Sequence, residues 1–332
     1  MKNFPRSVCL FLAAIIVVLS SNCWSISVAL AAEFQLRIGL IRTDSAFPYF
    51  VMREQGFDKR NGLLFEAMGD KSGAQILTDL AAGTLDVSVT AGSIPVFFAA
   101  QKGLIPSKVV LVGASSIADP DHPSAAVLAS PAIKTWTDLK GRHIAITDKR
   151  SINTIALTMR LKQEGVRDYR LLEMAYPNIG LAVAGGNAAA ASLSEPYLTQ
   201  SILRGDGKLL GWVIGGAPFE RFQLGMIAVN ADLYRNNPQA VKAYLRGHLQ
   251  SLKWISQNPD GARSILSKWM QLTPEVTKKI KLKKWPLDAR NDPDLLDTMQ
   301  RRLLEAGVLH SQIPARQLYD ERLLDEVLKE RR

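Results

Sequence analysis

Hydroxyl-bearing residues and glycines gather at four places where a β-rich run gives way to a helical pattern. Serine and threonine at such positions cap helices, and the first turn of a helix offers unpaired amide hydrogens with a partial positive charge. Groups of this kind bind anions and other acceptor-rich ligands. The chemistry predicted for them is therefore ligand binding. The four junctions contain Thr43–Ser45, Gly92 with Ser93, Arg150 with Ser151, and Ser192–Glu195.

Positive charge lies next to one of these junctions. Lys149 and Arg150 precede Ser151, so two cations flank a helix N-terminus that already favours anions. Arg42, in the first junction, could add a third cation from the opposite side of a crevice. These residues favour an acidic ligand.

Acidic residues at the same junctions leave the charge of the ligand undetermined. Asp44, Asp148 and Glu195 could neutralise the cations or bind the ammonium group of a zwitterion. Each serine could also do no more than cap its own helix, but four such junctions together favour a pocket. The candidate ligand-binding residues are Arg42, Thr43, Asp44, Ser45, Gly92, Ser93, Lys149, Arg150, Ser151, Ser194, Glu195 and, as an aromatic wall, Tyr197.

The sequence offers little for covalent or metal chemistry. It lacks the G-x-S-x-G elbow, H-E-x-x-H and the G-x-x-x-x-G-K phosphate loop. The four histidines are scattered without the spacing of metal ligands, and no cysteine follows Cys23. We therefore expect neither an enzyme nor a bound metal or cofactor.

The elements that position these junctions alternate between short β-rich runs and amphipathic helical stretches, which is an α/β pattern with mostly parallel sheets. Residues 72–82 form such a stretch, and Gly83 supplies its left-handed end. The clearest strands are Leu36–Ile41, Leu85–Val89, Val109–Val112, His143–Ile146 and Ala188–Ser192.

After residue 230 the pattern becomes helical. Pro238 opens a long amphipathic helix, and further helices are predicted near Pro274 and near Pro293, the last with Asp292 as its N-cap. The basic run 278–285 reads as a solvated helix face with a few apolar anchors rather than a docking patch. The breaker-rich loop 118–123 is the first candidate for a crossing between lobes.

The first residues read as a secretory signal. Lys2 and Arg6 precede an apolar run, and residues 29–31 supply a small-residue cleavage pattern. A retained anchor is disfavoured because the run is shorter than the roughly 20 residues that a spanning helix needs, and the residues before Cys23 do not fit a lipoprotein signal. Both cysteines lie in this leader, so we expect an exported chain without disulfides.

Composition and charge limit the classes of binding partner. The 332 residues are 47% hydrophobic with a formal net charge of +10, and removal of the leader leaves a charge of about +8. Export excludes nucleic acid, and most charges alternate in sign as on an ordinary solvated surface. The length of the mature chain suggests two lobes rather than one.

A string of short segments occurs in order along the chain. The segments are Phe47-Pro48 with 54–57 and 61–63, then 80–87, Ser93–Pro95, 138–145, 237–238 with 254–259, and Tyr319-Asp320. Together they resemble the periplasmic solute-binding proteins of ABC importers in the nitrate, sulfonate, taurine and thiamine-precursor group. The similarity covers essentially the whole mature chain.

This resemblance implies a two-lobed, type II periplasmic-binding-protein fold with two hinge crossings. It implies lobe 1 at 32–123 and 222–332, lobe 2 at 124–221, and residues 1–31 as the signal peptide. It further implies a monomer in the periplasm that holds a small solute between its lobes and delivers it to an inner-membrane permease. Two departures fall in the pocket: Ser194 replaces a Trp of many members, and Arg150 replaces the usual Gly.

Rival functions share this framework. The same fold hosts pyrimidine-precursor synthases and lyases of quinone pathways, and a sensory module would use the same two-lobed trap. Sulfonates, nitrate, taurine, aromatic acids and heterocyclic vitamin precursors are all compatible ligands. The sequence therefore predicts a solute-binding component without naming its solute.

Overall fold

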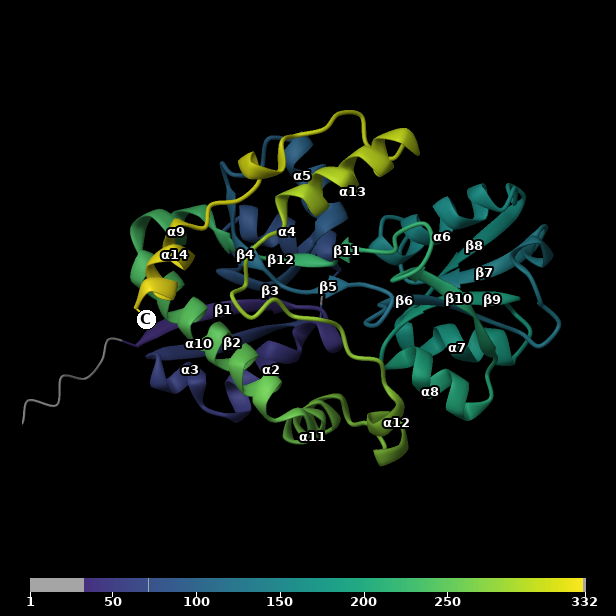
Figure 1. Ribbon diagram of the computed structural model, residues 1–332, viewed down its shortest axis with the longest axis horizontal. Helices are drawn as coiled ribbons and strands as arrows, with labels where there is room; N and C mark the ends of the chain where they lie inside the picture. Colours follow the sequence, from purple (N-terminus) through teal and green to yellow (C-terminus); the bar gives the residue numbers. More distant parts are fainter. Residues whose placement is uncertain (1–32, 71, 331–332) are drawn as a thin grey trace, which may run out of the picture. The chain divides into compact units, whose positions relative to one another are not determined.

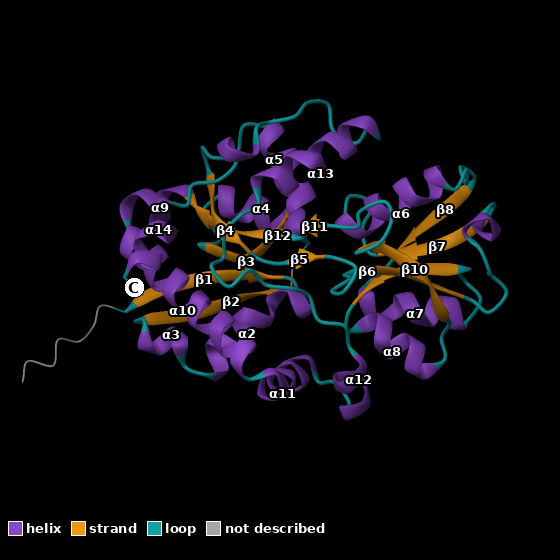
Figure 2. Ribbon diagram, viewed as in Figure 1, coloured by secondary structure: helices purple, strands orange, loops and turns teal. Residues whose placement is uncertain are grey.

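Two five-stranded sheets and one two-stranded sheet form within residues 33–70 and 72–330, the part of the chain that the computed structural model describes (Figure 1, Figure 2). The predicted signal peptide, with Cys9 and Cys23, lies outside these described residues. The fold is the predicted α/β architecture of two sheets, each flanked by helices.

The first sheet has the strand order β2-β1-β3-β12-β4. Strand β1 pairs in parallel with β2 and β3, while β12 runs antiparallel to both β3 and β4. Four strands therefore point the same way, and the late strand β12 is the reversed one. Their bounds are β1 (Phe34–Leu40), β2 (Leu63–Asp70), β3 (Val87–Gly92), β4 (Val109–Ala114) and β12 (Gly225–Asn230).

Helices cover both faces of this sheet, which is why its strands are almost continuously apolar. Along β4, Val109 and Leu111 pack into one core while Val110 and Val112 pack into the other, as alternation across a strand requires. The core of Val110 holds α2 (Phe47–Glu54), α10 (Pro238–Gln257), α11 (Pro259–Met270) and α14 (Arg322–Lys329). The core of Val109 holds α4 (Gly73–Ala81), α5 (Ser93–Gln101) and α13 (Pro293–Glu305).

The second sheet has the order β10-β6-β9-β7-β8 and repeats the scheme, with β6 as the reversed strand. One face packs against α6 (Ile152–Gln163), and the other packs against α7 (Tyr176–Ala184) and α8 (Tyr197–Arg204). The strand bounds are β6 (Ala125–Ala129), β7 (Arg142–Ile146), β8 (Tyr169–Glu173), β9 (Ala190–Ser194) and β10 (Lys208–Ile214).

Two chain crossings join the lobes. Strand β5 (Ile117–Ala118) leads from the first sheet towards β6, and β11 (Phe222–Gln223) leads back from β10 towards β12. The two short strands pair antiparallel, Phe222 with Ala118. The loop 118–123, predicted as a crossing, follows β5 directly.

The predicted elements are confirmed in place. The five predicted strands coincide with β1, β3, β4, β7 and β9 to within a few residues. Ser72 caps α4 by accepting the amide of Gln75 at 3.3 Å, and Gly83 adopts a left-handed φ of +73° after the helix. Asp292 caps α13 by accepting the amide of Leu295 at 3.0 Å.

The remaining short elements connect these layers. They are η1 (Asp44–Ala46), α3 (Phe57–Arg60), η2 (Trp136–Leu139), α9 (Ala231–Asn236), α12 (Pro274–Lys279) and η3 (Ala315–Gln317).

None of the helices in the described residues is both long and apolar enough to cross a bilayer.

Candidate functional site

A cavity of about 690 Å³ opens between residues of the two lobes, and we call it the outer cleft. The first lobe contributes the turn after β1 and the start of α4, while the second contributes the ends of β7 and β8 and the start of α7. Its lining is largely apolar, with two arginines at its edge. The lining residues are Ile41, Arg42, Ser72, Gly73, Ala74, Pro95, Thr147, Asp148, Arg150, Ser151, Glu173–Pro177 and Tyr197.

A smaller cavity of about 120 Å³ continues the outer cleft inwards, and we call it the inner chamber. The two cavities share several lining residues, so they lie next to each other. The inner chamber is markedly richer in hydroxyl groups. It is lined by Ile41, Thr43, Ser45, Gly73, Thr90, Gly92, Pro95, Ser124, Ser151–Asn153, Tyr176, Ser194, Leu224 and Lys283.

A buried ion pair lies at the first-lobe end of the inner chamber. Lys283 forms an ion pair with Asp44 and donates a hydrogen bond of 2.7 Å to Ser45 Oγ. Both charged side chains are almost fully excluded from solvent, with exposed fractions of 3% for Lys283 and 1% for Asp44. Burial raises the pKa of Asp44, and the ammonium of Lys283 opposes this rise. Asp44 Oδ2 is buried without a hydrogen-bond partner.

The second lobe supplies a hydrogen-bonded group around Asn153, in the first turn of α6. Asn153 Nδ2 donates to Ser194 Oγ at 2.8 Å and to the Tyr176 hydroxyl at 3.3 Å. Ser151 caps the same helix by accepting the amide of Thr154 at 3.2 Å. These bonds fix side chains from β9, α6 and α7 at one wall.

An aromatic pair stands where the inner chamber meets the outer cleft. The rings of Tyr176 and Tyr197 are stacked with centroids 4.7 Å apart and planes 8° apart. Removal of the Tyr176 hydroxyl from solvent raises its pKa to about 12, so this hydroxyl is neutral and can donate. The pair provides a flat apolar surface with a polar edge.

Eight of the twelve sequence-predicted residues line one of the two cavities, and their contact with a ligand stays a prediction. They are Arg42, Thr43, Ser45, Gly92, Arg150, Ser151, Ser194 and Tyr197. The other four do not line either cavity within the described chain. They are Asp44, Ser93, Lys149 and Glu195.

Each of these four side chains is engaged elsewhere. Ser93 is fully buried and donates its hydroxyl to the Gln223 carbonyl at 2.6 Å, so it ties α5 to the hinge strand β11. Lys149 forms an exposed ion pair of 3.1 Å with Glu173. Asp44 lies behind Lys283, which takes its place at the chamber wall.

Glu195 holds the start of α8 and reaches the C-terminal segment of the chain. Its carboxylate accepts the Thr199 hydroxyl at 2.8 Å, the Thr199 amide at 3.1 Å and the Lys281 amide at 3.4 Å. Burial raises its pKa, and the bonds from Thr199 oppose this rise. Its contacts are therefore within the protein.

Sequence reasoning missed Asn153, Tyr176 and Lys283. The prediction that 278–285 forms a solvated helix face is wrong, because α12 ends at Lys279 and the chain then runs extended. Lys284 pairs with hinge residue Ile117, its carbonyl accepting the Ile117 amide at 2.8 Å. This pairing turns the neighbouring Lys283 inwards. Asn153 and Tyr176 carried a usable signal, because both follow the carboxyl end of a strand.

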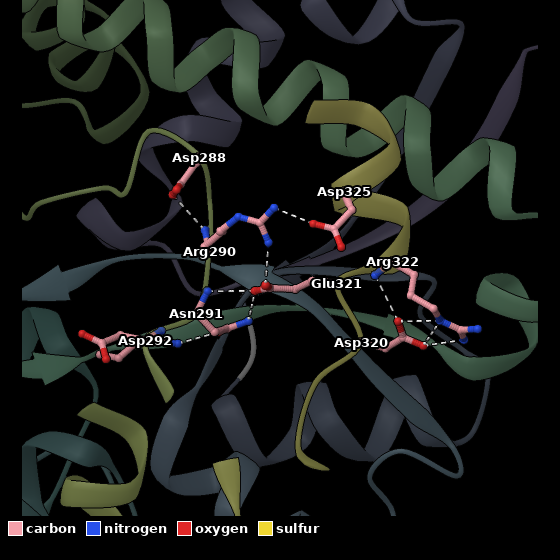
Figure 3. A network of polar contacts seen from close by, with 9 residues as sticks. Asp288, Arg290, Asn291, Asp292, Asp320, Glu321, Arg322 and Asp325 are labelled. Atoms are coloured by element: carbon pink, nitrogen blue, oxygen red, sulfur yellow. Dashed lines mark hydrogen bonds and ion pairs between the residues drawn. The ribbon is translucent and has the colours of Figure 1, made fainter. Parts of the chain in front are cut away.

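A second charged cluster, the C-terminal network, lies around the start of α14 (Figure 3). Arg290 bonds to Glu321 at 3.2 Å and also to Asp325, while Glu321 accepts both nitrogens of Asn291 at 2.8 Å. Arg322 donates two hydrogen bonds, from Nε and Nη2, to the two carboxylate oxygens of Asp320. A cavity of about 670 Å³ adjoins the network. Among the described residues, no group of three His, Cys, Asp or Glu side chains is arranged to hold a metal ion.

Solved structures with the same fold include binding proteins and an enzyme. The alkanesulfonate-binding protein SsuA from Xanthomonas axonopodis pv. citri, bound to MOPS, is 21% identical with a TM-score of 0.66, over 90% of this chain and 99% of its own. The nitrate-binding protein NrtA from Synechocystis PCC 6803 is 14% identical with a TM-score of 0.72, over 90% and 89%. The desulfurization enzyme DSZB is 15% identical with a TM-score of 0.67, over 90% and 99%.

Together with the cleft between two lobes, these matches define the class as a periplasmic-binding-protein fold. The NMT1-like family profile matches residues 31–271, more than half of the sequence, and the chain belongs to this family. No curated protein matches the sequence significantly.

Proposed function

We propose that this chain is the extracytoplasmic solute-binding component of an ABC importer, which captures a small anionic or zwitterionic organic solute and delivers it to a permease. The observation that carries this proposal is the pair of adjacent cavities between the lobes, whose polar groups come from both. SsuA and NrtA, which share the fold, are named for alkanesulfonate and nitrate.

The mechanism is a shift in population between open and closed forms. A ligand that touches Ser45 and Lys283 on one lobe and Ser194 on the other makes all its contacts only when the lobes are close. It therefore binds the closed form more tightly, and this difference in affinity drives closure. The closed form is the state that the permease would recognise.

The proposal also covers the limits of the lobes and the location of the protein. Lobe 1 comprises 32–123 and 222–332, and lobe 2 comprises 124–221. Residues 1–31 are a cleaved signal peptide, so the mature protein works in the periplasm as a monomer that does not bind nucleic acid.

A binding role is favoured over catalysis by the contact between Lys283 and Ser45. DSZB shows that this fold can host an enzyme, and Ser45 with Lys283 has the spacing of a nucleophile and its base. However, Lys283 donates its hydrogen bond to Ser45 Oγ and forms an ion pair with Asp44, so its nitrogen is placed as a donor and not as a base. A thiamine-precursor-like heterocycle or a sensory partner remains the alternative within the binding class.

A thermal-shift screen of residues 32–332 tests the proposal. The panel contains sulfonates, nitrate, taurine, aromatic acids and pyrimidine precursors. A true ligand at one hundred times its dissociation constant stabilises the folded state by about 2.7 kcal/mol. Each hit is then incubated with the protein and recovered. Recovery of unchanged ligand supports binding, whereas a chemically altered product, or no shift with any compound, contradicts the proposal.

A further inference from the structure

The inner chamber presents hydrogen-bond donors and no lining carboxylate among the described residues. A hydroxyl group can donate or accept a hydrogen bond, and several hydroxyl oxygens of the chamber already accept one from a fixed donor. Lys283 donates to Ser45 Oγ, and Asn153 donates to both Ser194 Oγ and the Tyr176 oxygen. A hydroxyl that accepts in this way keeps its own hydrogen for another partner. These hydroxyl groups can therefore donate hydrogen bonds to a ligand in the chamber.

Lys283 adds a charged donor to this set. An ammonium has three N–H groups, and Asp44 and Ser45 take two of them. Asp44 does not line the chamber, so its ion pair with Lys283 lies behind the chamber wall. A charge-assisted bond to this third N–H, in a site excluded from water, is stronger than one to an exposed cation. Arg42 and Arg150 line only the outer cleft and are exposed.

The two cavities differ in size and so fit two different parts of a ligand. The inner chamber, at about 120 Å³, holds on the order of four waters' share of liquid volume, which suits a carboxylate or a sulfonate group. The outer cleft is several times larger and lined by Met174, Pro177 and the stacked tyrosines. An inorganic ion would leave this apolar surface uncovered.

We propose that Lys283 is the recognition residue for the anionic group of the solute, and that the solute is an organic anion with a flat apolar body. Its carboxylate, sulfinate or sulfonate head occupies the inner chamber, and its body lies against Tyr176 and Tyr197. This inference rests on the proposed function and deepens it, because it names the charge and the shape of the ligand.

The test compares anionic probes with neutral probes of similar size, and with an inorganic anion. Calorimetric titration compares benzoate and benzenesulfonate with the neutral benzamide and benzenesulfonamide, and with nitrate. The variant is Asp44→Asn/Lys283→Met, which removes both charges and leaves no unpaired ion. The control is Asp320→Asn/Arg322→Met, which removes a carboxylate and its cation in the C-terminal network. We expect wild type and control to prefer the anions at least tenfold over the amides, and the variant to lose this preference.

Each outcome decides one point. Wild type that binds the anions, with a variant that binds them equally well, overturns the role of Lys283 and leaves the proposed function standing. Wild type that prefers the amides or nitrate overturns the inference about the charge or the apolar body of the solute, while the wider screen still decides the proposed function. Wild type that binds no probe overturns this inference, while the wider screen still decides the proposed function. If the double variant does not fold, Ser45→Ala in an otherwise intact chamber replaces it, with a selective loss of anion affinity expected.

Discussion

The buried Asp44–Lys283 pair and the C-terminal network are both clusters of opposite charges, but they differ in what they leave unused. In the C-terminal network, Glu321 and Asp325 share Arg290, and Asn291 adds two donors to Glu321. The remaining N–H groups of Arg290 belong to a side chain that is open to water. At the inner chamber, Lys283 keeps an N–H group on a side chain that is buried. A buried donor beside a cavity, rather than charge density, therefore distinguishes the proposed binding site from a structural clamp.

The clusters also differ in solvent exposure and so in the strength of their interactions. Arg322 has an exposed fraction of 78% and Arg290 one of 42%, whereas Lys283 and Asp44 have 3% and 1%. Exposed pairs are screened by water and salt, and each contributes little. A buried pair is costly to form, and the loss of one partner leaves an ion in a medium that cannot solvate it.

The largest expected effect follows from this difference. Lys283→Met should lower the free energy of unfolding by about 3–5 kcal/mol, because it leaves Asp44 buried and unpaired. Since burial raises the pKa of Asp44, the stability lost at neutral pH should partly return as pH falls and the carboxyl binds a proton. Urea unfolding at pH 5 and pH 8 measures both effects. Asp44→Asn/Lys283→Met should recover most of the loss, and equal instability of the single and double variants would contradict this reasoning.

A buried titratable group without any partner sharpens the comparison. His248, in α10, has no hydrogen-bond partner, and burial lowers its pKa to about 4. The unfolded chain therefore binds a proton near pH 6.5 while the folded chain does not, so stability falls as pH drops from about 6.5 towards 4, by up to about 3 kcal/mol. Unfolding of wild type and His248→Leu across this window gives the difference. The same pH slope in both proteins would rule out His248 as the cause.

Serine-to-alanine substitutions distinguish hydroxyl groups that bind ligand from those that only stabilise the fold. Ser45→Ala, Ser151→Ala and Ser194→Ala should each weaken ligand by about 1 kcal/mol, roughly fivefold in affinity. Ser93→Ala is the matched control, because its hydroxyl bonds to the Gln223 carbonyl. It should lower stability by about 1 kcal/mol and leave affinity unchanged. Titration and urea unfolding of all four variants check this, and an affinity loss in Ser93→Ala would return that residue to the site.

The smallest effect is expected in the C-terminal network. Arg290→Gln removes the bonds to Glu321 and Asp325, both partly open to water, and should cost at most about 1 kcal/mol in unfolding free energy. The cost should shrink further at high salt. Thermal unfolding at low and high ionic strength measures it. A loss as large as that of Lys283→Met would erase the distinction between the two clusters.

The fold was predictable because its signals are local. Short apolar runs separated by amphipathic stretches indicated β1, β3, β4, β7 and β9, and caps such as Ser72 and Asp292 marked helix starts. The position of the cleft followed from one further rule, that ligands bind at the carboxyl ends of parallel strands. These inferences need only spacing and residue type.

The detailed site was less predictable because it depends on which distant segment approaches each junction. Ser93 and Ser194 look alike in sequence, yet β11 lies against one and the chamber against the other. Lys283 resembles its neighbours in a basic run, and only its pairing with Asp44, 239 residues earlier, sets it apart. No pattern within a single sequence encodes such a pairing.

The return of the C-terminal segment to η1 places a chamber residue beyond the part of the chain that the family profile matches. The family match ends at residue 271, before Lys283, while every strand of the two large sheets ends by Asn230. The same tail supplies α13 and α14 to the two cores of the first sheet, so its apolar side chains stabilise the fold while Lys283 lines the inner chamber. An exchange of only Lys283 and its partner Asp44 would therefore test selectivity between relatives at a smaller cost in packing than an exchange of the whole tail.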